Sequence, residues 1–350
     1  MISELKIDDV GFGGNGVGRS GGKVIFVPFT LDGEEVTVRI SQQKKKFATA
    51  ELISVEKPSP FRIEPACQYF GRCGGCSYQH IEYARQIEIK ARQVEQTIKR
   101  VGRLDNVPMR PMIASPKEFG YRNRIRVHVA DGMVGFYAPD RLELVDIESC
   151  PLASPQVNEA LLELRSRAVR DGDYTLAERR GGYFEQTNDG ASEKMLTLVE
   201  ETVRRGQSLL IDAYCGAGLF AKRLAGLFEQ VAGIEENPYA VQYAQRTAGS
   251  NEVYFAGDVA GHLPEVFGKA DAATTTLLLD PPAIGISTEV ADLILASRPS
   301  EIVYVSCNPA TLARDLSILC RNYRLESVTP LDMFPQTAEI EVIVHLVNPL

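Results

Sequence analysis

An apolar strand runs directly into a glycine-rich turn in the stretch Leu209-Leu210-Ile211-Asp212-Ala213-Tyr214-Cys215-Gly216-Ala217-Gly218-Leu219. Similar apolar runs follow at residues 231–234, 277–279 and 302–305. Continuous apolar runs of this kind are typical of parallel strands that are buried between helices. From about residue 185 onward, the sequence therefore predicts a Rossmann-like, doubly wound α/β domain, which binds its ligands beyond the carboxyl ends of the strands.

The N-terminal part has a different pattern. Apolar and polar residues alternate at 23–29, 35–40 and 48–55, and seven glycines lie between positions 11 and 22. We expect a small β-barrel of the OB type with a glycine-rich loop. An amphipathic helix that stops at Gly102 follows further along, and its apolar face is formed by Ala84, Ile87, Ala91, Val94, Ile98 and Val101. Short strand-like stretches return at 121–150.

Charge is distributed unevenly along the chain. Residues 1–126 hold 21 Lys and Arg against 14 Asp and Glu, a net charge of +7, whereas residues 127–350 hold 17 against 32, a net charge of -15. These sum to the overall charge of -8. A basic N-terminal part followed by an acidic remainder is typical of a protein that binds nucleic acid with its N-terminal part. Basic runs such as 44–46, however, are often only solvated faces.

The bulk composition is that of a globular protein. The chain has 350 residues, 44% of them hydrophobic and 24% charged, which predicts two or three domains. No apolar run is long enough to span a bilayer, and the N-terminus has no basic region followed by an apolar one. We therefore expect a cytoplasmic protein without a membrane partner, and we expect a monomer.

Four cysteines suggest a metal site. Cys67, Cys73 and Cys76 are spaced C-x5-C-x2-C, and Cys150 follows much later. Four thiolates can hold a tetrahedral metal ion or a cubane cluster. Zinc sites more often pair two C-x2-C halves, so this spacing favours iron–sulfur, while zinc and unconnected thiols stay open as alternatives.

The glycine-rich turn predicts a nucleotide-like cofactor. Gly216 and Gly218 let the backbone approach a ligand closely. Glu235 ends the next expected strand, where a carboxylate can accept hydrogen bonds from both ribose hydroxyls, and Asp258 follows the third strand, where it could meet an adenine amino group. The turn alone also fits an NAD enzyme, and glycines that serve only the turn are the structural alternative.

Two later loops favour methyl transfer over hydride transfer. Asp280 precedes two prolines that end the strand at 277–279 sharply, so its side chain is presented at the cleft, although a helix N-cap is an alternative role. Cys307 follows the next strand on the same rim. Carbon 5 of a pyrimidine is too weakly nucleophilic to attack a methylsulfonium until a thiolate has added to carbon 6. Cys307 is therefore the candidate nucleophile, with a buried, inert thiol as the alternative.

The same chemistry needs a base that later removes the proton from carbon 5. Glu339 and Glu341 lie two residues apart near the C-terminus. In a strand, both side chains would face the same side. No step requires an electron, so a structural role is expected for any cluster on the cysteines.

Together, these motifs resemble the bacterial and archaeal RNA uracil-5-methyltransferase family over nearly the whole chain. The segments that carry the resemblance are 184–188, 214–218, 279–282, 304–311 and 333–337. Residues 1–56 are similar to the family's TRAM domain, an OB-type RNA-binding module. The cysteine spacing is similar to the 4Fe-4S site of the members that modify rRNA.

The resemblance implies methyl transfer from S-adenosylmethionine to carbon 5 of a uridine in structured RNA, either rRNA or tRNA. It implies a TRAM domain at 1–56, a small α+β iron–sulfur domain at 57–180 and a methyltransferase domain at 181–350. The implied catalytic residues are Cys307 as nucleophile, Glu341 as base and Asp280 as the contact of the target base. The implied cofactor residues are Gln186, Tyr214, Gly216, Gly218, Glu235, Asp258 and Asp280, and the implied 4Fe-4S ligands are Cys67, Cys73, Cys76 and Cys150.

Three positions depart from the family pattern. Ala283 replaces the Arg that usually follows Asp-Pro-Pro, Leu219 replaces an Asn of the cofactor turn, and Glu339 replaces a His two residues before the base. They motivate a second hypothesis, an RNA-binding protein with a degraded methyltransferase site. Glu339 also leaves open which glutamate acts as the base.

Overall fold

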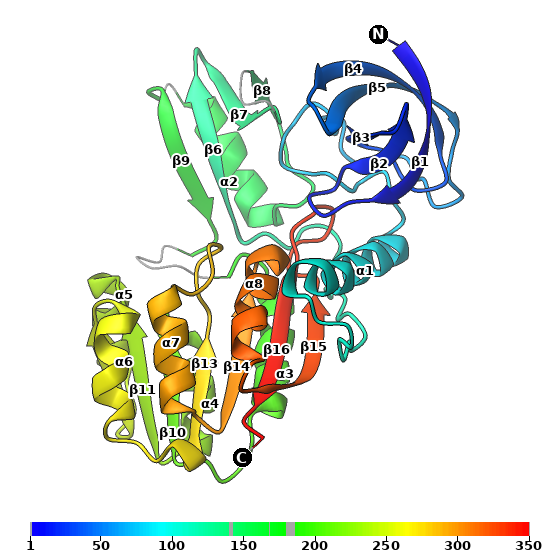
Figure 1. The fold of residues 1–350 in the computed structure, drawn as a ribbon. Helices are drawn as coiled ribbons and strands as arrows, with labels where there is room; N and C mark the ends of the chain where they lie inside the picture. Colours follow the sequence, from blue (N-terminus) through cyan, green and yellow to red (C-terminus); the bar gives the residue numbers. More distant parts are fainter. Residues whose placement is uncertain (1, 140–142, 168, 180–185, 350) are drawn as a thin grey trace. The chain divides into compact units, whose positions relative to one another are not determined.

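The computed structural model describes residues 2–139, 143–167, 169–179 and 186–349 (Figure 1). The chain forms two compact units. The first consists of residues 1–93, 115–179 and 334–339, and the second of residues 94–114, 180–333 and 340–350. The units are interleaved in sequence, because helix α1 (Tyr83–Gly102) and the segment before the last strand each contribute residues to both.

The first unit contains a closed five-stranded barrel. Its strands are β1 (Ile2–Val10), β2 (Gly16–Ser20), β3 (Lys23–Val27), β4 (Glu35–Gln43) and β5 (Phe47–Lys57). They are joined in the order β1-β2-β3-β5-β4, and β1 pairs with β4 to close the barrel. Alternate residues of the strands, such as Val36 and Val38, are buried inside, as the period of two requires. The predicted OB-type barrel is confirmed.

The first unit also contains a small antiparallel sheet. Its order is β8-β7-β6-β9, with strands β6 (Arg124–Ala130), β7 (Met133–Tyr137), β8 (Leu144–Asp146) and β9 (Gly172–Ala177). Helix α2 (Pro155–Ser166) begins at Ser154, whose side chain accepts a hydrogen bond from the backbone of Val157. Val157 and Leu161 of this helix are fully buried in one core with Val127 of β6.

The second unit is built on a seven-stranded sheet. Its order is β12-β11-β10-β13-β14-β16-β15. The strands are β10 (Leu209–Ala213), β11 (Gln230–Glu235), β12 (Glu252–Ala256), β13 (Thr275–Leu279), β14 (Glu301–Ser306), β15 (Arg324–Leu331) and β16 (Glu341–Val347). The first five strands in this order run parallel, and β16 runs antiparallel to both of its neighbours. Every residue of β13 and β14 is buried, which explains their continuous apolar runs.

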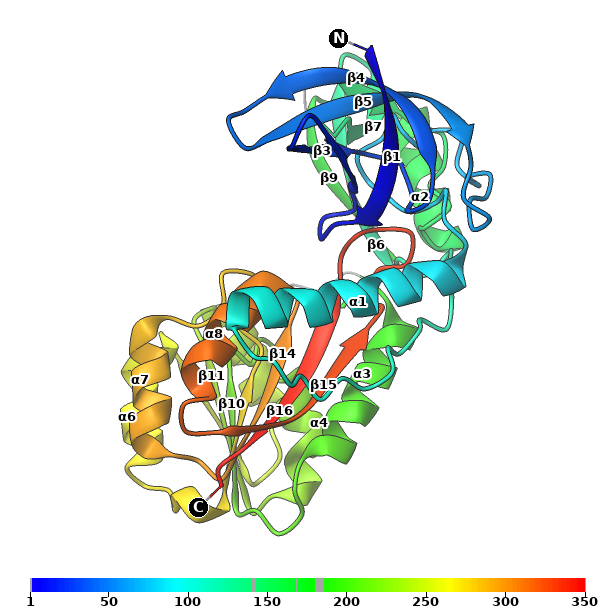
Figure 2. The ribbon, with the colours of Figure 1, turned by 45° about the vertical axis from the view of Figure 1, so that its right-hand side comes forward.

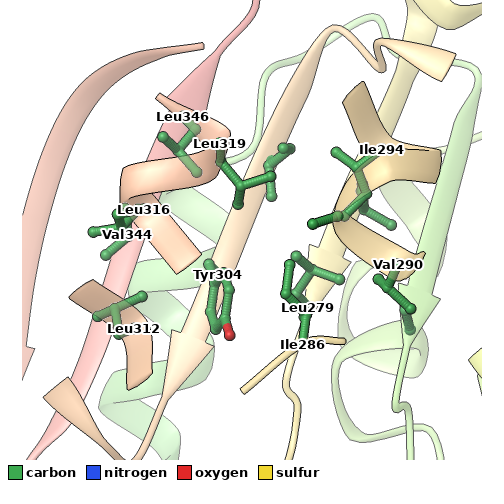
Figure 3. Packing of buried hydrophobic residues seen from close by; sticks show 14 of the residues in the cluster. Leu279, Ile286, Val290, Ile294, Tyr304, Leu312, Leu316, Leu319, Val344 and Leu346 are labelled. Atoms are coloured by element: carbon green, nitrogen blue, oxygen red, sulfur yellow. The ribbon is translucent and has the colours of Figure 1, made fainter. Parts of the chain in front are cut away.

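Helices cover both faces of this sheet. They are α3 (Asp189–Thr202), α4 (Leu219–Leu224), α5 (Pro238–Arg246), α6 (Val259–Phe267), α7 (Thr288–Ser297) and α8 (Pro309–Leu319), with short 3-10 helices at Ala225–Leu227 and Ala272–Thr274. Helices α3 and α4 lie on one face, and α6, α7 and α8 lie on the other (Figure 2). Figure 3 shows Leu312, Leu316 and Leu319 of α8 packed with Tyr304 of β14 in the main core.

The predicted fold class is therefore confirmed: an N-terminal OB-type barrel, a small α+β part and a doubly wound α/β sheet. The amphipathic helix ends at Gly102 as predicted. In the described parts of the chain, no helix has both the length and the apolar character needed to cross a membrane.

Candidate active site

The predicted cofactor and base-contacting residues emerge at one edge of the seven-stranded sheet. In the parallel pairing of β10 with β13, Ala213 lies opposite Leu279, and the next residues in the chain are Tyr214 and Asp280. The amide of Asp280 donates a hydrogen bond to the carbonyl of Ala213, at 3.3 Å. Because parallel strands end at the same edge, these residues meet at the carboxyl edge of the sheet.

Strand register brings the candidate nucleophile and base to this same edge. Leu279 of β13 lies opposite Tyr304 of β14, and Cys307 follows β14. Strand β16 runs antiparallel to β14, and the last pair is Ser306 with Val342. Cys307 is the residue after Ser306, and Glu341, the first residue of β16, is the residue before Val342, so both lie next to this last pair. Cys307 is half-buried, and Glu341 is 5% exposed.

The expectation that Glu339 and Glu341 share one strand face is wrong. Strand β16 begins at Glu341, so Glu339 precedes the strand and its side chain is exposed. The alternation of side chains applies only within a strand. Among the two glutamates, only Glu341 is placed by the register of β16.

The glycine-rich turn has the backbone geometry that glycine permits. Gly216 has φ 54°, and Gly218, which precedes α4, has φ 84°. The carboxylate of Glu235 accepts a hydrogen bond from the amide of Gly216 at 3.0 Å and another from the amide of Asn237 at 2.7 Å. Glu235 therefore joins the end of β11 to the turn after β10.

Asp258 has a structural contact that the sequence did not predict. It caps the N-terminus of α6, where its side chain accepts a hydrogen bond from the amide of Gly261 at 3.3 Å. It follows β12 at the carboxyl edge of the sheet, as expected. A carboxylate can accept several hydrogen bonds, so Asp258 could accept one from a cofactor in addition to the one from Gly261.

Asp280 does not cap the following helix, because Ser287 is the N-cap of α7. The loop between them is held by α8 instead. The carbonyl of Ala283 accepts hydrogen bonds from the side chains of Asn308 at 3.2 Å and Thr311 at 2.9 Å. These contacts use the main chain of residue 283, so the order of this loop does not require the Arg side chain that the family usually has there.

Sequence reasoning missed one further carboxyl group near this edge. Asp212, within β10, is fully buried and accepts a hydrogen bond from the amide of Ala221 at 2.8 Å. Burial raises the pKa of Asp212 to about 8, with smaller contributions from Asp280 and Glu235. Burial also raises the pKa of Asp280 to about 7, again helped by Glu235. A charged residue inside an apolar strand was the signal that could have identified Asp212.

Gln186 is half-buried just before Asn188, the N-cap of α3. The Asn188 side chain donates a hydrogen bond to the carbonyl of Met333 at 2.9 Å, which ties the start of α3 to the chain just beyond β15. The rest of the predicted cofactor segment, Phe184 and Glu185, lies outside the described residues. A cofactor role for Gln186 therefore stays a prediction.

The four predicted metal ligands line one cavity of about 280 Å³ in the first unit. Cys67, Cys73, Cys76 and Cys150 share its wall with Arg122 and with apolar side chains. Burial raises the pKa of the Cys76 thiol to about 12. The Cys76 sulfur accepts a hydrogen bond from Gln79 Nε2 at 3.2 Å, and the Cys73 sulfur accepts one from the Gly75 amide at 3.4 Å. Within the described ranges, no three or more His, Cys, Asp or Glu side chains are arranged to hold a single metal ion.

Two known sequence families match parts of the chain. The tRNA (uracil-5-)-methyltransferase family matches residues 268–348, which include Asp280, Cys307 and Glu341. The TRAM domain matches residues 2–53, which form most of the barrel.

Longer similarities cover nearly the whole chain. An RNA methyltransferase of Thermosynechococcus vestitus, itself uncharacterised, is 31% identical over 98% of this chain and 97% of its own length. The tRNA (uracil(54)-C(5))-methyltransferase of Schizosaccharomyces pombe is 29% identical over 98% of this chain and 77% of its own length. The crystal structure of the Pyrococcus abyssi tRNA (uracil-54, C5)-methyltransferase in complex with S-adenosyl-L-homocysteine has the same fold, with a TM-score of 0.74 at 24% identity over 99% of this chain and all of that one. Sequence similarity of this extent shows common descent, and the chain belongs to the RNA uracil-5-methyltransferase family.

Proposed function

We propose that this chain transfers the methyl group of S-adenosylmethionine to carbon 5 of a uridine in structured RNA, either tRNA or rRNA. The observation that carries the proposal is the pairing of Ser306 with Val342, because Cys307 follows Ser306 in the chain, Glu341 precedes Val342, and Asp280 follows the neighbouring strand β13. The reaction needs a nucleophile and a base on the same target ring, beside the methyl donor. Membership of the family supports the same reaction.

In the proposed mechanism, the Cys307 thiolate adds to carbon 6 of the uracil, and the electron pair of the carbon 5–carbon 6 double bond moves toward carbon 5 and O4. Carbon 5 then attacks the methyl group, and S-adenosylhomocysteine leaves. Glu341 takes the remaining proton from carbon 5, the double bond forms again, and the thiolate leaves carbon 6. Asp280 holds the uracil in place. A uridine in folded RNA must leave its stack to reach this edge.

The cofactor is proposed to bind along the carboxyl edge of the sheet. The residues proposed to hold it are Gln186, Tyr214, Gly216, Gly218, Glu235, Asp258 and Asp280. Nearby carboxylates make ionisation costly at this edge, because Glu235 contributes to the raised pKa of both Asp212 and Asp280, and Asp280 contributes to that of Asp212. A positively charged sulfonium would relieve that cost.

We further propose that Cys67, Cys73, Cys76 and Cys150 hold a 4Fe-4S cluster. Support comes from the donor set and its surroundings: four thiols line a single cavity, and N–H groups point at two of the sulfurs. When bound, the cluster would supply a covalent cross-link between loop 67–76 and Cys150, and no electron for methyl transfer.

The proposed partner is RNA, which the barrel and the basic face of α1 would bind. No membrane partner is proposed. A cytoplasmic location, a monomeric state and the division into domains at 1–56, 57–180 and 181–350 belong to the same proposal. The barrel itself lies within residues 2–57, close to the proposed first boundary.

The test is methyl transfer from labelled S-adenosylmethionine to RNA taken from cells that lack this gene. We expect wild type to form 5-methyluridine at one mapped position. Cys307→Ala should abolish product while S-adenosylhomocysteine still raises the melting temperature, because the thiol is needed for chemistry and not for cofactor binding. The matched control is Cys320→Ala, which removes the half-buried thiol that follows α8.

The opposite result would be a folded, cluster-loaded wild type that transfers no methyl group to any RNA. That result would favour an RNA-binding protein with a degraded site, and Ala283→Arg would be the first variant to examine. Stabilisation by NAD instead of S-adenosylhomocysteine would favour hydride transfer.

A further inference from the structure

The segment that immediately precedes the proposed base is bound within the first unit. Strand β15 ends at Leu331 and β16 begins at Glu341, and residues 334–339 between them belong to the first unit. The contacts of this segment are concentrated on Gln336, which is 2% exposed. Its position is therefore set by residues that are remote in sequence.

Four hydrogen bonds fix Gln336 on both its side chain and its backbone. Gln86 of α1 uses both ends of its amide: Nε2 donates to Gln336 Oε1 at 2.9 Å, and Oε1 accepts from the Gln336 amide at 3.1 Å. The carbonyl of Gln336 accepts from the amides of Ser77 and Tyr78, at 3.1 and 3.0 Å. We name this set of contacts the Gln336 clamp.

The backbone of Gln336 is strained. Its φ of 69° lies in the left-handed region, which residues other than glycine rarely adopt. Such a conformation persists only where the surrounding contacts determine it, and it is concentrated at functional sites. The clamp supplies those contacts.

Neighbouring residues extend the clamp. The carbonyl of Phe334 accepts a hydrogen bond from the fully buried Lys90 at 3.1 Å, and the carbonyl of Pro335 accepts one from the Tyr121 hydroxyl at 2.9 Å. Ala338 packs against a buried cluster that includes Tyr78. Three consecutive carbonyls, from Phe334 to Gln336, are therefore engaged.

Several clamp residues are neighbours in the chain of residues that line the cysteine cavity. Ser77 and Tyr78 follow Cys76 in the chain, and Tyr121 precedes Arg122, which lines the cavity. Gln79 joins two of the cysteines, because its side chain donates to the Cys76 sulfur at 3.2 Å and accepts from the Cys67 amide at 3.0 Å.

We propose that the Gln336 clamp positions Glu341 for proton removal, so that the cysteine cavity sets the geometry of the proposed base. This inference rests on the proposed function. Segment 334–339 is followed by Ile340 and then by Glu341, so a single residue separates the clamped segment from the start of β16. Successive side chains of a strand point to opposite faces, and a slip of one residue at this entry would turn the Glu341 side chain to the other face of the sheet. Gln86 is thus a positioning residue.

The affected step has a distinctive chemical consequence. Before Glu341 acts, the RNA is joined to Cys307 by a carbon–sulfur bond at carbon 6, and carbon 5 already carries the new methyl group. Release requires that the carbon 5–hydrogen bond breaks, that the proton goes to the carboxylate, and that the electron pair restores the double bond and expels the thiolate. A misplaced base leaves methyl transfer intact and retains the covalent adduct.

The experiment compares Gln86→Met with Gln93→Met in the full-length, cluster-loaded protein. Both residues are buried glutamines of α1, but the side-chain amide of Gln93 donates to the carbonyls of Val10 and Gly11 and to the hydroxyl of Tyr78, whereas that of Gln86 bonds to Gln336 directly. Cluster absorbance and melting temperature are measured for both. End-labelled RNA and S-adenosylmethionine are added, and adduct that survives denaturing electrophoresis is quantified against methyl groups transferred.

We expect Gln86→Met to raise the ratio of adduct to methyl groups transferred on the order of tenfold or more, because small misplacements of a catalytic group have effects of this size. Gln93→Met should keep the ratio of wild type. If Gln86→Met does not fold, Tyr121→Phe, which deletes only a hydroxyl, is expected to shift the ratio in the same direction. Ratios equal to wild type in the folded variants, or an equal rise in Gln93→Met, would overturn the inference. The proposed function fails separately, when wild type itself forms neither adduct nor 5-methyluridine.

Discussion

At the scale of single residues, the folded structure changes the pKa of Asp280, which follows β13 at the carboxyl edge of the sheet. Asp280 has a pKa of about 7 in the folded protein because burial, and then Glu235, disfavour its carboxylate, against an ordinary value of 3.8. Between these two values the folded state binds more protons than the unfolded state. The free energy of unfolding must therefore fall as pH rises from about 4 to about 7, by at most about 1.4 kcal/mol per pH unit for this one group.

Asp280→Asn should remove this contribution, because the amide does not ionise. We expect the stability of the variant relative to wild type to increase with pH between about 5 and 7, and to level off above that range. The measurement is the free energy of unfolding in denaturant at several pH values. Asp292→Asn, at an exposed position of α7, serves as control. A difference between Asp280→Asn and wild type that does not change with pH would contradict the assigned ionisation.

At the scale of elements, the turn between β10 and α4 has two requirements at Gly218. Its φ of 84° is costly for any residue with a Cβ, and a Cβ at this position would lie 2.8 Å from the hydroxyl oxygen of Tyr254. The turn is also tied to β11 through Glu235. The conformation of the turn and the spacing of β10 and β11 therefore depend on the same few atoms.

Gly218→Ala should destabilise the protein by about 1–2 kcal/mol, the cost of a left-handed alanine, and should weaken binding of S-adenosylhomocysteine. Thermal unfolding with and without this ligand reports both effects. The matched control is Gly226→Ala, where an added Cβ meets no atom within 4 Å. Undiminished stabilisation by the ligand in Gly218→Ala would argue against this turn as the cofactor site.

At the scale of the whole molecule, the net positive charge and the α/β sheet lie in different parts of the sequence. The net charge of +7 lies in residues 1–126, which include the barrel, whereas the α/β sheet lies within the part with a net charge of -15. Lys44, Lys45 and Lys46 are exposed between β4 and β5. Neutralising RNA phosphates releases counterions, so binding by such a surface weakens as salt concentration rises.

Replacing all three lysines by Gln should lower RNA affinity and flatten its dependence on salt. On single-stranded RNA, the slope of log K against log salt should fall by up to about 0.7 for each phosphate that the protein no longer neutralises. Filter binding over a range of salt concentrations measures it. Replacing the three lysines by Arg keeps the charge and should keep the slope, and S-adenosylhomocysteine binding should not change in either protein. Equal slopes for the Gln and Arg proteins would remove this loop from the RNA interface.

Features that depend on neighbouring residues could be predicted from the sequence alone. Alternation indicated the barrel strands, and the spacing of apolar residues indicated helix α1 to its end at Gly102. The glycine-rich turn and the residues after β13 and β14 were located because strand ends and turns have local sequence signals. Topology rules then predicted that Asp280 and Cys307 share an edge, since parallel strands present their carboxyl ends together.

Relations between distant segments required the folded structure. Cys307 and Glu341 both lie next to the pair of Ser306 and Val342 because β16 runs antiparallel beside β14, and neither strand encodes that register alone. The same register corrected the expectation for Glu339. Gln86 and Gln336 are 250 residues apart, and only folding joins them. The protonation of Asp212 likewise depends on burial, which is a property of the packed sheet. Local propensity selects the elements, but long-range packing selects which side chains meet, because each such meeting requires the rest of the core to be in place.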